Sequence, residues 1–277
     1  MRIVDAHIHP DFAVVDQIPP ELMAQEMLAK MDPFGVSVSG ILGVVDPKQD
    51  AESVRRVNNY TAKTVAAAPE RLYGLVFMNP NLDDGFVAEE LDRCLEMPEF
   101  RGIKLEFDLN CRSSRMRVLM ERAIAHAVPI LHHSWYVNLW DYPTPERQSE
   151  RSEAHDIAAL ARDYPEARIL MAHLEGSGLR GVRDIENVPN IWVDTSGSQP
   201  FTGTLEYALD VLGADRILYG SDLFGRSLHS QLGRIFGAKM SDDERQQILW
   251  RNATSLFNLG DLAIEDRQID GKLGGIF

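Results

Sequence analysis

Short runs of aliphatic and β-branched residues alternate along the chain with longer amphipathic segments. The runs are almost continuously apolar, which is typical of parallel strands covered on both faces. The segments between them have helical periodicity, as in residues 51–69, 113–127 and 153–165. Eight strands are predicted, over residues 2–9, 36–45, 71–78, 101–107, 128–134, 167–173, 190–196 and 216–222.

Eight alternating strand and helix units predict closure into a single (β/α)8 barrel of the TIM type rather than an open sheet. The 277 residues suit one such barrel, which typically needs about 250. One domain over residues 1–277 is therefore expected. An extra helix follows the last strand, and a Gly-rich tail over 260–277 is either loose or docked on the barrel or on a partner.

Helix boundaries are predicted by capping residues. Asp50, Asp83 and Ser114 stand where N-caps belong, just before helical segments. Ser241 followed by Glu244 forms a capping box for the last helix.

Composition excludes several classes of function. The formal charge of −14 repels a polyanion, so nucleic acid is not an expected partner. No apolar stretch is long enough to span a membrane, and the first residues lack the apolar segment of a signal peptide. The two cysteines are too few for a disulfide framework. A cytoplasmic protein is therefore expected, with a small-molecule substrate as its partner.

Histidines gather at the ends of the predicted strands. His7 and His9 are separated by one residue, so in a strand both side chains point to the same face. His133 ends the fifth strand, His173 the sixth and Asp222 the eighth. Barrel active sites are built at these strand ends, and imidazole and carboxylate groups are ligands of divalent metals. The sequence therefore predicts a metal site at the mouth of the barrel.

With these residues in place, the chain resembles the amidohydrolase superfamily, closest to its amidohydrolase-related group, amidohydrolase-2. The resemblance runs from Arg2 to about Leu259 and depends on DAHIHP, RGIKLEF, PILHHS, ILMAHLEG, WVDTSG and ILYGSDLF in that order. It implies a divalent metal, with zinc favoured over manganese and one ion favoured over two. The metal ligands carried over are His7, His9, His133 and Asp222.

The resemblance also implies roles beside the metal. His173 polarises substrate or water in one-metal relatives and is a ligand in two-metal relatives. Asp222 accepts a proton from the attacking water, and Lys104 either adds positive charge or, when carboxylated, bridges two ions. Glu106 stands where many relatives have histidine, and because it shares a face with Lys104 it either pairs with that lysine or contacts the metal.

Substrate contacts are expected from loops at the same end of the barrel. The aromatic loop that follows the fifth strand includes Trp135, Tyr136 and Trp140, which either wall a substrate pocket or form a subunit interface. A homodimer is compatible with that loop. Arg226, in the loop after Asp222, is a candidate to bind an anionic group of the substrate, as an alternative to an ordinary surface role.

The favoured function is a metal-dependent hydrolase that uses a metal-activated water on a lactone, ester or amide of a small, carboxylated molecule. The alternative is a non-oxidative decarboxylase of an aromatic or muconate-type acid, since several amidohydrolase-2 relatives have that activity. The compact chain favours hydrolysis, because such decarboxylases often carry an extended insertion. A barrel that has lost activity and only binds ligands is a third interpretation, disfavoured by the full ligand set.

Overall fold

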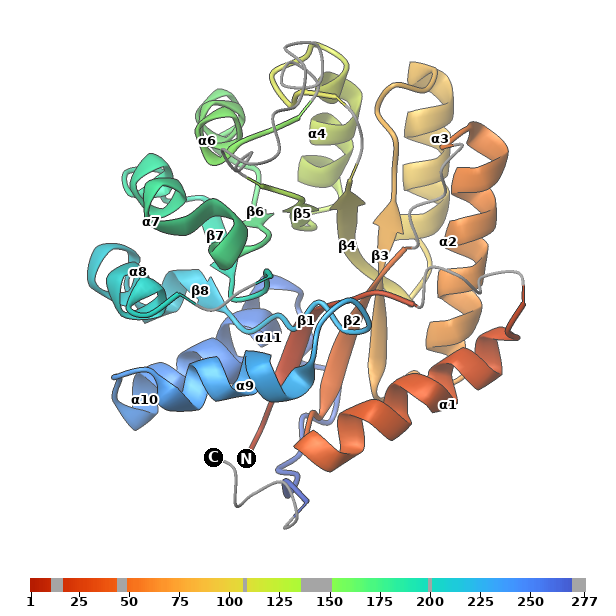
Figure 1. Ribbon diagram of the computed structural model, residues 1–277. Helices are drawn as coiled ribbons and strands as arrows, with labels where there is room; N and C mark the ends of the chain where they lie inside the picture. Colours follow the sequence, from red (N-terminus) through yellow and green to blue (C-terminus); the bar gives the residue numbers. More distant parts are fainter. Residues whose placement is uncertain (11–16, 44–48, 107–108, 136–150, 199–200, 271–277) are drawn as a thin grey trace.

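Eight parallel strands form one sheet in sequence order, from β1 to β8, and the helices surround it (Figure 1). The computed structural model describes residues 1–10, 17–43, 49–106, 109–135, 151–198 and 201–270. The strands are β1 (Val4–Ile8), β2 (Val38–Leu42), β3 (Leu72–Phe77), β4 (Phe100–Leu105), β5 (Ile130–His132), β6 (Ile169–Met171), β7 (Ile191–Asp194) and β8 (Ile217–Leu218).

The sheet closes on itself between its first and last strands. Ile8 forms a parallel bridge with Leu223, just beyond β8. The Asp222 amide donates to the carbonyl of His7 over 2.7 Å, and the His9 amide donates to the carbonyl of Leu223 over 2.7 Å. These bonds confirm the predicted (β/α)8 barrel and place the ends of β1 and β8 side by side.

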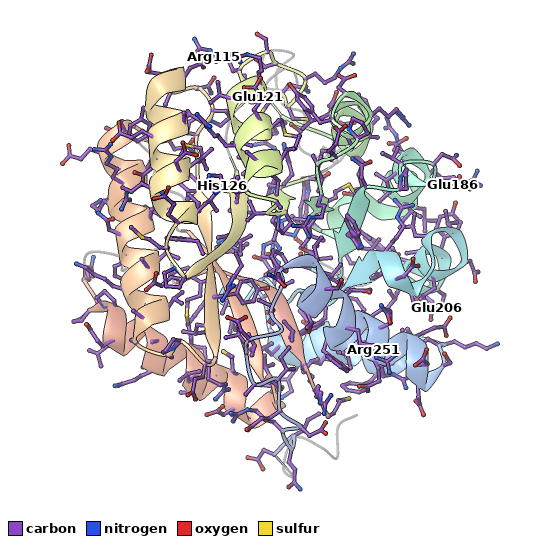
Figure 2. The ribbon with its side chains drawn as sticks, turned by 180° about the vertical axis from the view of Figure 1, so that it is seen from behind. Arg115, Glu121, His126, Glu186, Glu206 and Arg251 are labelled. Carbon is purple, nitrogen blue, oxygen red and sulfur yellow. The ribbon has the colours of Figure 1, made fainter. Side chains whose placement is uncertain are left out.

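The outer layer consists mainly of α-helices, whose labelled charged side chains such as Glu186 and Glu206 point away from the barrel (Figure 2). Their bounds are α1 (Pro20–Met31), α2 (Ala51–Ala66), α3 (Asp84–Leu95), α4 (Met116–Ala125), α6 (Ala154–Asp163), α7 (Leu174–Ile185), α8 (Thr204–Leu212) and α9 (Leu228–Gly237). The expected C-terminal extension is α10 (Asp242–Gln246), a π-helical turn and α11 (Asn252–Leu256). Among the described residues, no helix is both long and apolar enough to cross a bilayer.

The helix caps agree with the sequence in all but one case. Asp50 accepts from the Ser53 amide, Asp83 accepts from the first amides of α3, and Ser241 forms the capping box of α10. The N-cap predicted at Ser114 is wrong. α4 starts at Met116 without a side-chain cap, because its first amides already donate to backbone carbonyls in the preceding turn.

Two apolar clusters make up the core. One lies between the strands and the surrounding helices, and it contains residues such as Ile8, Ile103 and Leu119. The other includes Leu131, which shares a face with His133 by strand alternation, so it fills the inside of the barrel. Leu256 and Phe257 extend this inner cluster from α11 and close the end opposite the histidines.

The described part of the tail, 260–270, is docked on the barrel. The Arg267 amide donates to the carbonyl of Met1 over 3.2 Å, and the amino terminus donates back to the carbonyl of Arg267 over 3.1 Å. The Asp270 amide bonds the carbonyl of Pro33 over 2.8 Å.

Candidate metal centre and active site

Three donor atoms from opposite ends of the chain converge where β1 and β8 end. His7 Nε2 lies 3.2 Å from His9 Nε2 and 3.7 Å from Asp222 Oδ1, while His9 Nε2 lies 3.6 Å from the same oxygen. Asp222 has a φ of 59°, an uncommon value for a residue with a side chain. Its main-chain bond to His7 holds it in this place.

The two imidazoles of this group face one another through their Nε2 atoms. His7 Nδ1 donates to Asp194 Oδ2 over 2.7 Å, which leaves the Nε2 of neutral His7 without a proton. His9 makes a hydrogen bond to the backbone of Gly43. Both rings are buried, and burial is the largest cause that lowers the pKa of His9 to about 4 and the pKa of His7 well below its usual value. Neutral imidazoles with free Nε2 atoms are the form that binds metals.

Asp194, the last residue of β7, is a site residue that the sequence patterns did not single out. Besides His7, it accepts at Oδ1 from the amides of His173 and Ser196, each over 3.0 Å, and from the Ser196 hydroxyl. A carboxylate that holds the second nitrogen of a metal-binding histidine is a common partner in such sites. The sequence signal that could have identified Asp194 is its position at the end of a predicted strand, like the other candidate site residues.

His133 and His173 form a second pair at the ends of β5 and β6. His173 Nε2 lies 3.2 Å from His133 Nδ1, and His173 Nδ1 lies 2.8 Å from Ser196 Oγ. Two compact donor groups occur among the described residues, His7 with His9 and Asp222, and His7 with His173 and Asp194. His133 is in neither group. Its neighbour His132 is buried, and its Nδ1 donates to the carbonyl of His133 over 2.7 Å.

Lys104 and Glu106 form an ion pair beside these histidines. Lys104 Nζ is fully buried and lies 3.5 Å from Glu106 Oε2, with no hydrogen-bond partner among the described residues. Glu106 Oε1 lies 3.7 Å from His133 Nδ1. Burial opposes ionisation of Glu106, but Lys104 together with His133, His9 and His7 outweighs it and lowers the pKa of Glu106 to about 2. The ion pair, one of the two expected arrangements, is therefore present.

The two carboxylate oxygens of Asp222 point toward different groups. Its Oδ1 is directed at the histidines, whereas Oδ2 lies 3.9 Å from Arg226 Nε. Burial raises the pKa of Asp222 to about 7, against the opposing effect of Lys104. Arg226 is fixed by a 2.8 Å bond from Nη2 to Ser198 Oγ.

A pocket of about 590 Å³ opens above these groups. Its lining includes His9, Glu106, His133, Trp135, Arg151, His173, Asp222 and Arg226. The Trp135 ring lies 5.5 Å from that of His173, centroid to centroid, so one aromatic residue of the loop does face the site. Tyr136 and Trp140, also expected there, lie outside the described residues. A larger hollow of about 980 Å³ beside α1 and α2 contains none of the strand-end donors.

Comparison with known proteins gives a consistent result. The family described as Amidohydrolase matches residues 4–259. A gamma-resorcylate decarboxylase from a Polaromonas species is 24% identical, and the match covers 82% of each chain. The structure of a 2,6-dihydroxybenzoate decarboxylase from Rhizobium matches with a TM-score of 0.73 at 21% identity, over 94% of this chain and 99% of that chain.

A third match bears on cofactors. The structure of a dihydroxybenzoic acid decarboxylase from Polaromonas, with bound manganese and the inhibitor 2-nitroresorcinol, matches with a TM-score of 0.69 at 22% identity. It covers 93% of this chain and 97% of that chain.

Proposed function

Because the chain belongs to the amidohydrolase family, we propose that it is a metal-dependent, non-oxidative decarboxylase of a hydroxylated aromatic acid. The observation that carries the proposal is the convergence of His7 Nε2, His9 Nε2 and Asp222 Oδ1 at the base of a substrate-sized pocket. The likeness to aromatic acid decarboxylases over most of the chain supports this reaction.

The donor set fits a divalent cation. Two neutral imidazole nitrogens and one carboxylate oxygen lie within 3.7 Å of one another, and both histidines are held by hydrogen bonds at their other ring nitrogen or to the backbone. His7, His9 and Asp222 would hold the ion, and His133 is the proposed fourth ligand. When bound, the cation supplies positive charge that holds oxygen atoms of the substrate. Manganese in one relative supports a divalent metal and gives no support to zinc specifically.

The side chains around the pocket allow a defined sequence of events. Arg226 binds an oxygen of the substrate, and Trp135 packs on one wall. Asp222 Oδ2, which faces Arg226 rather than the histidines, holds the proton that is delivered to the ring carbon bearing the carboxylate. The bond between that carbon and the carboxylate then breaks, its electron pair restores the aromatic ring, and carbon dioxide leaves. Asp222 regains a proton from solvent.

The relatives support decarboxylation better than hydrolysis, the reaction that the sequence favours. The compact chain was the argument for hydrolysis, yet the match covers 99% of a decarboxylase chain, so compactness no longer separates the two. The relatives support decarboxylation, and among the pocket residues that the structure describes no specific contact favours a lactone or an ester.

Carbon dioxide release tests the proposal. Purified protein loaded with Mn²⁺ is assayed against 2,6-dihydroxybenzoate and related hydroxybenzoates, and in parallel against aryl esters and lactones. We expect release from at least one hydroxybenzoate, and a loss of at least 100-fold in kcat for Asp222→Asn, a typical cost of removing a proton-transfer group. Ester or lactone turnover without carbon dioxide release would overturn the proposal.

A further inference from the structure

A continuous line of contacts joins three of the site histidines. It runs from His7 to Asp194, then to Ser196, His173 and finally His133. The residues come from the ends of β1, β7, β6 and β5, and Ser196, Asp194 and His7 are fully buried. Water therefore has little access to the bonds among these three residues, whereas the His133 side chain is 34% exposed. In each bond of the line, the shared proton belongs to one of the two partners.

The carboxylate of Asp194 sets the direction of every bond. A carboxylate only accepts, so the Ser196 hydroxyl donates its single proton to Asp194 Oδ1. Ser196 Oγ must then accept from His173 Nδ1, 2.8 Å away. A neutral imidazole has one N–H group, so His173 Nε2 carries a lone pair.

The same logic continues to the last ring. His173 Nε2 can only accept, so the proton in its 3.2 Å contact with His133 Nδ1 belongs to His133. The position of Glu106 Oε1, 3.7 Å from that same nitrogen, favours a proton there. His133 Nε2 is left with a lone pair. On the other side of Asp194, His7 Nδ1 donates directly to Oδ2, so its Nε2 is free as well.

We infer that Asp194 and Ser196 form a one-way hydrogen-bond chain that fixes His7, His173 and His133 as Nδ1–H tautomers. Ser196 is thus a positioning residue that prepares a remote imidazole, His133, to present its Nε2 atom. Asp194 and Ser196 hold the His7–His173–Asp194 group together with hydrogen bonds, so this group is not a second metal site. His173 is engaged through both ring nitrogens, which favours one ion per chain.

The tautomers themselves are measurable without metal. In protein labelled with ¹⁵N-histidine and stripped of metal, two-bond ¹H–¹⁵N correlation spectra distinguish Nδ1–H from Nε2–H rings. We expect Nδ1–H at residues 7, 133 and 173, each assigned by the histidine variant that removes its signals. An Nε2–H ring at residue 133 or 173 in the wild-type protein overturns the inference, and this readout needs no Ser196 variant to fold.

The consequence for metal binding rests on the proposed function and is tested separately. Ser196→Ala removes the acceptor for His173, and we expect Mn²⁺ affinity, measured by chelator competition, to fall 10–100-fold, as is typical for partners of metal ligands. Ser196→Thr keeps the hydroxyl and should restore the affinity. The matched control is Ser39→Ala. This variant also removes a buried hydroxyl, but one that lies on β2 and takes no part in the hydrogen-bond chain.

The outcomes separate the two proposals. If Ser196→Ala binds Mn²⁺ as tightly as Ser39→Ala does, and His173 keeps its Nδ1–H tautomer, Ser196 has no positioning role. If the wild-type protein shows the expected tautomers but binds neither Mn²⁺ nor Zn²⁺, the inferred hydrogen-bond chain is supported and the proposed metal-dependent function is wrong.

Discussion

Asp194 reaches His7 across an intervening strand. The two residues end β7 and line β1, with β8 between them, yet Asp194 Oδ2 lies 2.7 Å from His7 Nδ1. Gly220, which follows β8, makes the approach possible. A Cβ atom at Gly220 would lie 2.9 Å from His7 Cβ and 3.1 Å from Asp194 Cβ, closer than such atoms pack.

Gly220→Ala adds a single methyl group, yet it should clearly lower both the stability of the fold and the affinity for metal. The added methyl group must push His7 and Asp194 apart, at a cost of about 1–3 kcal/mol for an overpacked interior. We expect a lower melting temperature together with at least tenfold weaker Mn²⁺ binding. Gly237→Ala is the control, because nothing lies within 4 Å of its Cβ. Equal metal affinity in both variants would show that the His7–Asp194 contact does not depend on Gly220.

The Lys104–Glu106 pair should stabilise the fold mainly by neutralising a buried cation. Glu106→Gln leaves the fully buried Lys104 without its counter-charge, and we expect a loss of about 2–3 kcal/mol in the free energy of unfolding, below the usual cost for a fully buried pair because Glu106 is partly exposed. Adding Lys104→Met should recover part of the loss, because the isolated charge is then gone. Urea denaturation of the two variants checks the order. A double variant less stable than Glu106→Gln would contradict it.

Metal should raise the stability of the whole barrel. A ligand that binds only the folded state at 100 times its Kd adds about 2.7 kcal/mol to the free energy of unfolding. We expect the melting temperature of chelator-treated protein to rise by roughly 5 °C or more on addition of Mn²⁺. His9→Asn should abolish this rise, whereas His155→Asn, at a half-exposed site on α6, should keep it. A rise that persists in His9→Asn would place the ion elsewhere.

The barrel was predictable because each strand is a short apolar run that can be recognised from its own residues. All eight observed strands overlap the predicted ranges, and the pair His7 and His9 needs only strand alternation to share a face. Asp194 was not predictable in this way. Its role arises because Gly220, just after β8, lets Asp194 of β7 contact His7 of β1, and this contact exists only once the barrel has closed.

The detailed position of His133 was also beyond the sequence. The resemblance to the amidohydrolase family predicts it as a metal ligand at the end of the fifth strand. Its contacts with His173 and Glu106 depend on the register between β4, β5 and β6. The Lys104–Glu106 pair could be foreseen as one of two arrangements, because alternation puts both on one face but does not say what each touches.

Arg226 should affect substrate binding more than folding. It is partly exposed, lines the pocket and lies 3.9 Å from Asp222 Oδ2. If it binds a charged oxygen of the substrate, Arg226→Met loses a charge-assisted hydrogen bond, about 1.5–3 kcal/mol, or roughly 10–100-fold in KM. The melting temperature should change little. An unchanged KM for the best hydroxybenzoate would exclude Arg226 from substrate recognition.

Glu90 should give the fold a defined sensitivity to acid. Its buried carboxylate accepts from Arg93 over 2.6 and 2.8 Å and from Asn58 over 3.0 Å. Burial opposes ionisation, but the bonds from Arg93 and Asn58 outweigh it, so the pKa of Glu90 is lowered in the folded state.

The sign of the pH effect follows from this shift. Below its ordinary pKa of about 4.3, the unfolded chain binds a proton at Glu90 while the folded chain still resists it. The stabilisation from Glu90 is therefore complete above about pH 5 and is lost as the pH falls through the lowered folded pKa. Glu90→Gln should cost about 2 kcal/mol at pH 7, since hydrogen bonds to a charged group are weakened, and clearly less at pH 3.5. Urea midpoints of both proteins across this range measure the difference, and a difference that stays constant down to pH 3.5 would mean that Glu90 is not the acid-sensitive group.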